Sequence, residues 1–409
     1  MSPERSSMSR LAASWVPLSA AERAVAIEVL THGPISRAEI ARKLNLSAGS
    51  LTRLTKPLIE SGLLVEDPAA HTSQSQSQPQ AQSQSPAQEA AIRQGRPSQP
   101  LDIVADSRYF AGFKITAEAV YGVVTTLKSD IVLRRTRLLT TREPEDVADL
   151  VHDLTEEFAL AFPRLAGIGV GVGGHVRGRA VVVESPFLNW QGVPFAELLE
   201  ERTGLPVVVE NDVAALVEAE AWFGAGRGLD RFAVLTIGAG IGYGLVIGSN
   251  LVRSAEDGHG IGRRWILNPN GPLTPDGERG SASALLSIPS IRYQVQAATG
   301  REVTYDEILT LAAAGDPVAA RVVDEAARGL GTLVAQIANF AMPQKILLAG
   351  EGVGLVDVAA TAVQESILAN RHPLADPVVL ETKVSDFNDW ARGAAVLAIQ
   401  VLVLGRDQG

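Results

Sequence analysis

Residues 71–100 most constrain what this chain can fold into, because they divide it into two parts that must each build a core. The stretch, HTSQSQSQPQAQSQSPAQEAAIRQGRPSQP, consists mostly of Gln, Ser, Pro and Ala, and its apolar residues follow no helical or strand period. Such a composition cannot bury enough apolar surface to offset the entropy lost on ordering. We therefore expect a small domain at 1–70, a linker or wing tip at 71–100, and a large domain at 101–409.

The small part carries the start and stop signals of three short helices. Ser19 and Ser36 are placed to cap the first two, and Glu39 completes a Ser-x-x-Glu capping box at the second. A tight turn separates the second helix from a third, which we expect over residues 47–62 because its leucines recur at helical spacing. The run Leu63-Leu64-Val65 then predicts a strand, one half of a β-hairpin wing.

Three short helices with a tight turn before the last are typical of a helix-turn-helix, whose last helix fits the major groove of DNA. Polar side chains on that helix have the chemistry to contact phosphates or base edges. Gly95-Arg96-Pro97 has the composition of a minor-groove arm. The same pattern also fits a small protein-interaction domain. The candidate DNA-binding residues are Ser47, Ser50, Thr52, Arg53, Lys56 and Arg96.

Composition limits the chemistry open to the chain. The net charge of -10 is uneven, since residues 1–100 carry 10 Lys and Arg against 8 Asp and Glu, and the remainder carries 26 against 38. Only the N-terminal part would therefore tolerate an anionic polymer. The absence of cysteine excludes disulfides, thiolate nucleophiles and cysteine zinc sites. With no secretory signal and no apolar run suited to a membrane helix, we expect a cytoplasmic protein without a membrane partner.

Strand-like and helix-like patterns alternate through the large part. Three apolar runs at 109–116, 119–127 and 131–139, joined by short turns, predict an antiparallel meander, and β–α units follow it. A second set of strands and helices begins at Phe232 and includes the glycine-rich turn Gly238–Gly242. Two similar halves indicate a two-lobed α/β fold with a cleft between the lobes.

Several motifs of the large part, in their order and spacing, resemble the ROK family of repressors and sugar kinases. They are Ser185–Trp190, Leu205–Ala215, Gly238–Gly242 and Ala255–His259. The resemblance covers roughly residues 108–405, and the winged helix-turn-helix before them resembles the repressor branch of the family. It implies the actin-like, ribonuclease-H-type ATPase fold, with a sugar held in the cleft.

The resemblance also implies a set of sugar contacts. Asp212 stands where a family kinase places the base that takes the proton from the attacked hydroxyl. Glu256 and His259 resemble the pair that reads further hydroxyls, each of which needs a partner once removed from water. In isolation, Asn211-Asp212 also fits a helix cap, and His259 a structural histidine. The candidate effector-binding residues are Asn189, Asn211, Asp212, Glu256 and His259.

Two departures from the family pattern argue against catalysis and against a bound metal. Where the kinases carry Asp-x-Gly-Gly-Thr to position magnesium and phosphates, this chain has Lys114 in place of the aspartate and side chains in place of both glycines. The zinc element has lost its three thiolates, and Ser283 replaces its final glutamate, which contacts sugar in relatives. The three former cysteine positions are Thr274, Asp276 and Ser281. We expect no catalytic residues, no cofactor and no metal.

These observations predict a sugar-responsive DNA-binding regulator, a repressor of carbohydrate uptake or metabolism genes that binds operator DNA as a homodimer or homotetramer. The oligomer rests on the resemblance. Free sugar, amino sugar and sugar phosphate all remain open as the effector. A phosphate would need nearby cations, and Arg253, Arg263 and Arg264 lie close in sequence to the Glu256–His259 motif.

Two other functions remain open at this stage. One is a sugar kinase with an appended DNA-binding domain, which Asp212 and the Gly238–Gly242 turn favour. The other is a constitutive DNA-binding protein with an empty cleft, which Ser283 and the lost zinc element favour.

Overall fold

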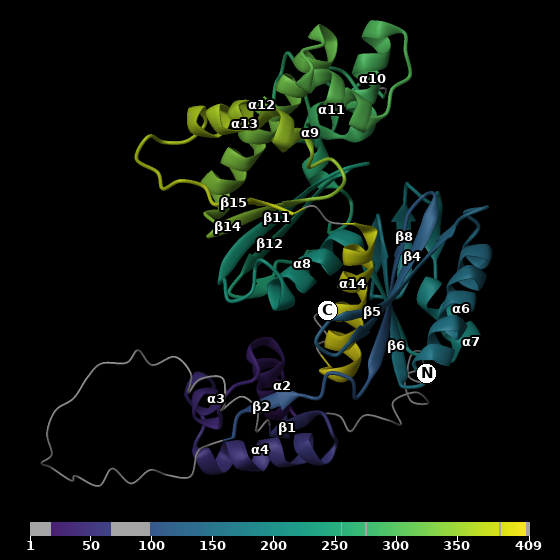
Figure 1. Cartoon of the computed structure of the whole chain (residues 1–409), viewed down its shortest axis with the longest axis vertical. Helices are drawn as coiled ribbons and strands as arrows, with labels where there is room; N and C mark the ends of the chain where they lie inside the picture. The colour runs from purple at the N-terminus through teal and green to yellow at the C-terminus, as the bar shows by residue number, and fades with distance from the viewer. Residues whose placement is uncertain (1–17, 67–98, 255, 275, 384–385, 406–409) are drawn as a thin grey trace, which may run out of the picture.

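A three-helix unit precedes two five-stranded sheets, each of which forms one lobe (Figure 1). The computed structural model describes residues 18–66, 99–254, 256–274, 276–383 and 386–405. Arg96 and most of the glutamine- and serine-rich stretch lie outside the described residues. Within the described ranges, no helix combines the length and the apolar character needed to cross a membrane.

The three-helix unit has the expected helix-turn-helix arrangement, and its first two helices begin at the predicted caps. Its helices are α2 (Ala20–His32), α3 (Arg37–Lys43) and α4 (Ala48–Glu60). Ser19, Ser36 and Ser47 each accept a hydrogen bond from a backbone N–H of the first turn, and the first two form capping boxes.

The wing itself is an antiparallel pair of short strands. Strand β1 (Leu64–Glu66) pairs with β2 (Leu101–Ile103), and Leu64 lies opposite Ile103. The chain thus returns to the three-helix unit beyond the glutamine- and serine-rich stretch. Residues 101–103, which we expected to open the large domain, instead complete the wing, because β1 without a partner would leave its backbone groups unpaired.

The first lobe is built on the sheet β10-β6-β3-β4-β5. The expected meander forms its antiparallel half, and two parallel strands extend it. Helices α6 and α7 pack on one face and α14 on the other, while a small sheet β7-β8-β9 lies at its edge. The elements are β3 (Tyr109–Ile115), β4 (Ala119–Thr126), β5 (Ile131–Leu138), α6 (Pro144–Ala161), β6 (Leu165–Val172), β7 (His175–Arg177), β8 (Val181–Ser185), β9 (Trp190–Val193), α7 (Phe195–Thr203), β10 (Val207–Asn211) and α14 (Phe387–Ala398).

The second lobe is built on the sheet β13-β12-β11-β14-β15. Long helix α12 packs along α13, with α9, α10 and α11 around them, and this bundle covers the sheet at the top of Figure 1. The elements are α8 (Asp212–Phe223), β11 (Arg231–Ile237), β12 (Ile241–Ile247), β13 (Asn250–Leu251), η3 (Ile261–Arg264), α9 (Ala282–Leu286), α10 (Ile288–Thr299), α11 (Tyr305–Ala313), α12 (Pro317–Ala341), β14 (Lys345–Ala349), α13 (Leu355–Ala369) and β15 (Leu380–Thr382).

Helix α14 lies directly on the first sheet because two glycines leave room for its backbone. A Cβ at Gly169 would come within 1.8 Å of the Ala394 carbonyl oxygen, and one at Gly112 within 2.0 Å of the Ala391 carbonyl oxygen. The other side of α14 packs against α8. These two helices therefore form the layer between the lobes (Figure 1).

The winged helix shares a hydrophobic core with the larger part of the chain. Val25, Ile40 and Leu58 of the three helices belong to the same buried cluster as residues of β3, α8 and η4 (Ile399–Val403), the continuation of α14. Trp222 of α8 and Val403 of η4 are both about 5% exposed in this cluster. The three-helix unit is therefore packed against the helices between the lobes.

Candidate functional site

The candidate effector site begins where β10 ends and α8 starts. Asn211 caps α8, because its Oδ1 accepts a hydrogen bond from the Ala214 N–H at 3.1 Å. Its side-chain nitrogen donates to the Gly174 carbonyl at 2.8 Å. Both ends of the amide thus have partners inside the protein. The helix-cap interpretation of Asn211 is confirmed, while the sugar contact that we expected of it stays a prediction.

Asp212 forms a buried ion pair with Lys114. Its Oδ2 accepts from the Lys114 ammonium group, and its Oδ1 accepts from the Val213 N–H at 2.8 Å. Lys114 and Asp212 are 6% and 9% exposed, and the ammonium nitrogen also lies 5.5 Å from the centre of the Trp390 ring. The lysine that replaces the expected aspartate therefore neutralises the candidate base. Both oxygens that would take a proton from a hydroxyl already accept hydrogen bonds.

The glycine-rich turn between β11 and β12 holds the carboxylate of Glu351. The Ala239 N–H donates to Glu351 Oε1 at 3.3 Å, and a Cβ at Gly238 would come within 2.4 Å of Oε2. We did not predict this residue as part of the site. Its signal was the position of an acidic residue between Gly350 and Gly352, directly after a strand that runs parallel to β11. Parallel neighbours end at the same edge of a sheet.

Phe187 connects the two halves of the site. A Cβ at Gly173 would lie 2.8 Å from the Phe187 ring and 3.5 Å from Asp212 Oδ2. A Cβ at Gly240 of the glycine-rich turn would lie 3.4 Å from the far end of the same ring. One aromatic ring therefore separates the surroundings of Asp212 from the turn that holds Glu351. Asn189 follows in the same loop, exposed and with a φ of 59°.

The loop at 256–259 lies against the backbone of Gly174, whose carbonyl also accepts the hydrogen bond from the Asn211 side chain. A Cβ at Gly258 would come within 2.2 Å of the Gly174 carbonyl oxygen. The ring of His259 stacks on that of His175, with 4.2 Å between centres, and His175 Nδ1 hydrogen-bonds to the Asp257 carbonyl at 2.6 Å. The structure thus brings the His259 loop beside Asn211 and Asp212. Glu256 is exposed on this loop.

The former zinc element is held by hydrogen bonds. Thr274 Oγ1 accepts from the Glu278 N–H at 2.8 Å, and Ser281 Oγ caps α9 by accepting from the Ala284 N–H at 3.1 Å. Hydroxyl groups and the single carboxylate of Asp276 do not fit the ligands that zinc prefers. Across the residues that the structure describes, no group of three or more metal-ligating side chains gathers at one point.

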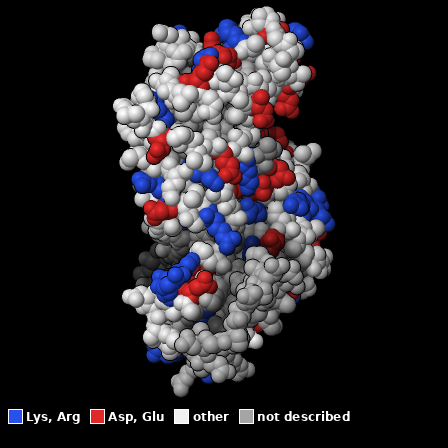
Figure 2. Space-filling model, turned by 60° about the vertical axis from the view of Figure 1, so that its left-hand side comes forward, with Lys and Arg blue, Asp and Glu red and all other residues white. Residues whose placement is uncertain are grey.

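The candidate DNA-binding residues lie along α4 of the winged helix. Thr52, Arg53 and Lys56 are exposed on it at helical spacing. Ser47 Oγ accepts from the Ser50 N–H at 3.1 Å, so Ser47 and Ser50 also fix the start of the helix. Basic and acidic side chains are interspersed on the face shown in Figure 2, so its charge pattern does not mark a DNA site there.

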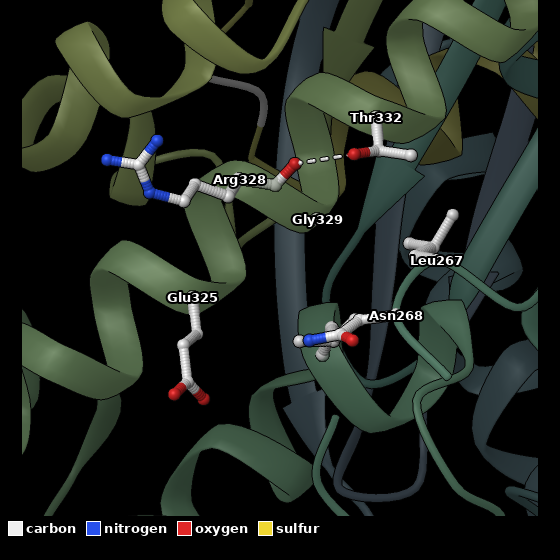
Figure 3. A pocket seen from close by; sticks show the side chains of 7 residues that line it. Leu267, Asn268, Glu325, Arg328, Gly329 and Thr332 are labelled. Carbon is white, nitrogen blue, oxygen red and sulfur yellow. Dashed lines mark hydrogen bonds between the residues drawn. The ribbon is translucent and has the colours of Figure 1, made fainter. Parts of the chain in front are cut away.

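A pocket in the second lobe lies away from these residues. This pocket of about 220 Å³ opens between α12 and the Leu267-Asn268 segment (Figure 3). Arg328 and Glu325 line it, but each already has an ion-pair partner on α12. None of the candidate effector residues lines this pocket, and we do not assign the effector to it.

The fold and the site together define a two-lobed, sugar-kinase-like domain joined to a winged helix. Two family models match the chain: the ROK family over residues 111–401, and a winged helix-turn-helix DNA-binding model over residues 27–65. The chain belongs to the ROK family.

Known proteins similar to this chain include both repressors and kinases. The xylose repressor of Bacillus subtilis is 25% identical over 78% of this chain and 79% of its own length. The glucokinase of Streptomyces coelicolor is 29% identical over 61% of this chain and 86% of its own. A solved ROK family transcriptional regulator, described as a homologue of Escherichia coli Mlc, has a TM-score of 0.75 at 23% identity, covering 94% of this chain and 96% of that one. The expected fold is confirmed.

Proposed function

We propose that the chain is a sugar-responsive transcriptional regulator that acts in the cytoplasm as a repressor of carbohydrate genes. The carrying observation is the core that the winged helix shares with helices α8 and η4. Family membership and the similarity to a xylose repressor support a sugar effector and the sign of regulation.

A direct structural route joins the candidate effector site to the winged helix. Asp212 is the first residue of α8, and Trp222 near the other end of that helix lies in the shared core. Midway along α8, Glu218 accepts a hydrogen bond at 3.1 Å from Gln400 of η4. A sugar bound beside Asp212 therefore acts on a helix whose far end contacts the DNA-binding unit.

Repression requires two reading helices at a fixed distance. Operator half-sites lie about one helical turn of DNA, or a multiple of it, apart, so a symmetric oligomer suits them. We propose a homodimer or homotetramer in which sugar binding changes the angle between the lobes, and with it the distance between the two copies of α4. That change in distance alters operator affinity.

A sugar kinase is the second candidate, and the similarity to glucokinases is what favours it. Against it stand the Lys114–Asp212 ion pair and the Glu351 carboxylate in the glycine-rich turn. Phosphoryl transfer needs a free base and a site that attracts phosphates and magnesium. We therefore expect no sugar-dependent ATP turnover. Turnover that disappears in Asp212→Asn would establish the kinase.

Footprinting of the full chain tests the regulator directly. The DNA would be the regions upstream of its own and adjacent genes, with and without a panel of sugars. We expect protection that one sugar abolishes or strengthens. Arg53→Ala should lower operator affinity by about 1–3 kcal/mol if it contacts a base edge, and leave sugar affinity unchanged. His259→Ala should do the reverse.

Arg321→Ala serves as the matched control, because Arg321 is an exposed arginine of α12 in the second lobe. It should change neither affinity. If the protein protects DNA and no sugar alters that protection, the chain is a constitutive DNA-binding protein. Unchanged operator affinity in Arg53→Ala would refute the assignment of α4 as the reading helix.

A further inference from the structure

A pocket of about 340 Å³ lies where the winged helix meets the first lobe. Residues 61–63, which follow α4 and lead into β1, form one wall, and residues that precede β3 and β6 form the other. The volume is within the roughly 300–1,000 Å³ typical of small-molecule sites. The pocket therefore has the size for a small ligand that contacts both parts of the chain.

The order of the strands brings two arginines into this pocket. Strands β3 and β6 are parallel neighbours, and Tyr109 at the start of one lies opposite Leu165 at the start of the other. The residues before them, Arg108 and Arg164, both line the pocket. The Tyr109 N–H donates to the Arg164 carbonyl at 3.1 Å, which holds the two backbones together. The candidate effector site lies at the opposite edge of this sheet, because it follows the end of the parallel strand β10.

The lining of the pocket is positively charged, although the chain has a net charge of -10. Among the described residues, no acidic side chain lines it beside the two arginines. Arg164 lies 3.9 Å from the Asp106 carboxylate, and the two side chains are 56% and 67% exposed. Such an exposed pair contributes little to stability, so a ligand can take over this guanidinium at small cost. The guanidinium also lies 5.9 Å from the centre of the Tyr109 ring, which holds it beside the pocket.

Ser107 supplies a hydroxyl group that has no partner in the protein. Its oxygen is shielded from solvent and makes no hydrogen bond with any residue that the structure describes. A buried hydroxyl in this state costs free energy that a hydrogen bond would recover. Because Ser107 lines the pocket, rotation of its side chain turns the hydroxyl toward a ligand without breaking a hydrogen bond. An anionic oxygen beside the arginines is a suitable acceptor.

The wall formed by the winged helix has the complementary chemistry. Ser61 Oγ donates to the Leu58 carbonyl at 3.0 Å, so this hydroxyl is left to accept. The C-terminal end of α4 adds partial negative charge on the same side. A ligand hydroxyl therefore suits this wall, and a ligand phosphate suits the wall that carries the arginines.

The phosphate of a small molecule suits this pocket better than the phosphate of DNA. Reading helices contact base edges through their N-terminal residues, whereas this pocket lies at the C-terminal end of α4. Glu60 at that end has a side chain 65% exposed, and its charge repels an extended polyanion. Glu60 does not line the pocket itself.

We propose that this pocket binds a small molecule that carries both a phosphate and a hydroxyl group. Arg108, Arg164 and Ser107 hold the phosphate, and Ser61 accepts a hydrogen bond from the hydroxyl. The ligand thus joins the first lobe to the winged helix at a point away from the candidate effector site. This inference goes beyond the proposed function and does not depend on a sugar response.

Calorimetric titration of the full chain tests the proposal with three probes. Glycerol 3-phosphate has both groups, inorganic phosphate has only the anion, and glycerol has only hydroxyls. We expect glycerol 3-phosphate to bind most tightly, inorganic phosphate more weakly, and glycerol not measurably. Arg164→Gln should weaken glycerol 3-phosphate binding by about tenfold or more, as the loss of a charge-assisted hydrogen bond would.

Ser107→Ala separates a binding role from a structural one. It should weaken glycerol 3-phosphate binding by about twofold to tenfold. It should not lower the melting temperature of the unliganded protein, because its hydroxyl has no partner to lose. A lower melting temperature with unchanged binding would contradict the role assigned to Ser107.

Arg321→Gln is the matched control, since its side chain is 55% exposed, against 56% for Arg164, and also pairs with one carboxylate. It should leave binding unchanged. The inference is wrong if neither phosphate probe binds, or if Arg164→Gln binds them as tightly as the unmodified protein. If, in addition, Arg164→Gln lowers operator affinity in phosphate-free buffer, this arginine contacts the DNA backbone instead.

Discussion

Replacing Lys114 by methionine should destabilise the protein measurably, because it leaves a buried carboxylate without its cation. Breaking a buried ion pair by removing one partner costs about 3–5 kcal/mol. Asp212 still accepts the hydrogen bond from the Val213 N–H and still lies at the positive N-terminal end of helix α8. These two interactions offset up to about 2 kcal/mol of that cost. We therefore expect a loss of about 2 kcal/mol. The unfolding entropy is about 2.1 cal/mol/K per residue, so in a chain of this length each kcal/mol shifts the melting temperature by about 1 °C, and we expect a fall of about 2–3 °C.

Thermal melting of a small set of variants checks this reasoning. Lys114→Met combined with Asp212→Asn should regain all but about 1 kcal/mol, because neither partner is then charged. Arg321→Met is the control, since it breaks an exposed pair with Glu325 and should cost under about 0.5 kcal/mol. The reasoning is refuted if Lys114→Met costs no more than this control, or if the double variant loses the sum of the single losses.

Four further substitutions test other parts of the structure. Gly169→Ala should lower stability by about 3 kcal/mol or more, because its Cβ would overlap the Ala394 carbonyl. Gly49→Ala should raise stability by up to about 1 kcal/mol, because Gly49 lies in α4 with open space around it. If either glycine variant melts at the same temperature as the unmodified protein, the prediction for that variant is wrong. Burial raises the pKa of the Glu200 carboxyl above its ordinary 4.5. The folded state therefore favours the protonated carboxyl, and stability is lost as pH rises and the group ionises. In urea titrations, Glu200→Gln should be more stable than the unmodified protein at pH 8 and no more stable at pH 4. Gln400→Leu removes one hydrogen-bond partner of Glu218. It should reduce the effect of sugar on operator affinity by about 2- to 30-fold and leave sugar affinity unchanged. If titrated footprints show the same sugar response as the unmodified protein, this prediction is wrong.

Elements that depend on local signals were predictable from the sequence. Ser19 and Ser36 identify helix starts through their own first turns, and the short turns of the meander define antiparallel strands. The same holds for Asn211, whose role as a helix cap needs only the residues that follow it. In each case the interacting groups lie close together in the sequence, so a short segment is enough to predict the contact.

Contacts between distant residues were not predictable in this way. Lys114 was recognised as unsuited to magnesium, but its pairing with Asp212, 98 positions away, depends on β3 and β10 both flanking β6. The approach of Glu351 to the glycine-rich turn likewise depends on two strands lying side by side. The second wing strand was missed because no local signal at Leu101 indicates pairing with Leu64–Glu66.

The core that the winged helix shares with α8 and η4 also limits how such a protein can be recombined. A DNA-binding unit on a free tether can be exchanged between regulators without cost to either half. Here, removing α2–α4 would expose Phe110, Trp222 and Val403 to water, and a foreign unit would have to match their shape. The two parts should therefore melt in a single transition. A new operator specificity is more readily obtained by changing the exposed face of α4 than by grafting a different winged helix.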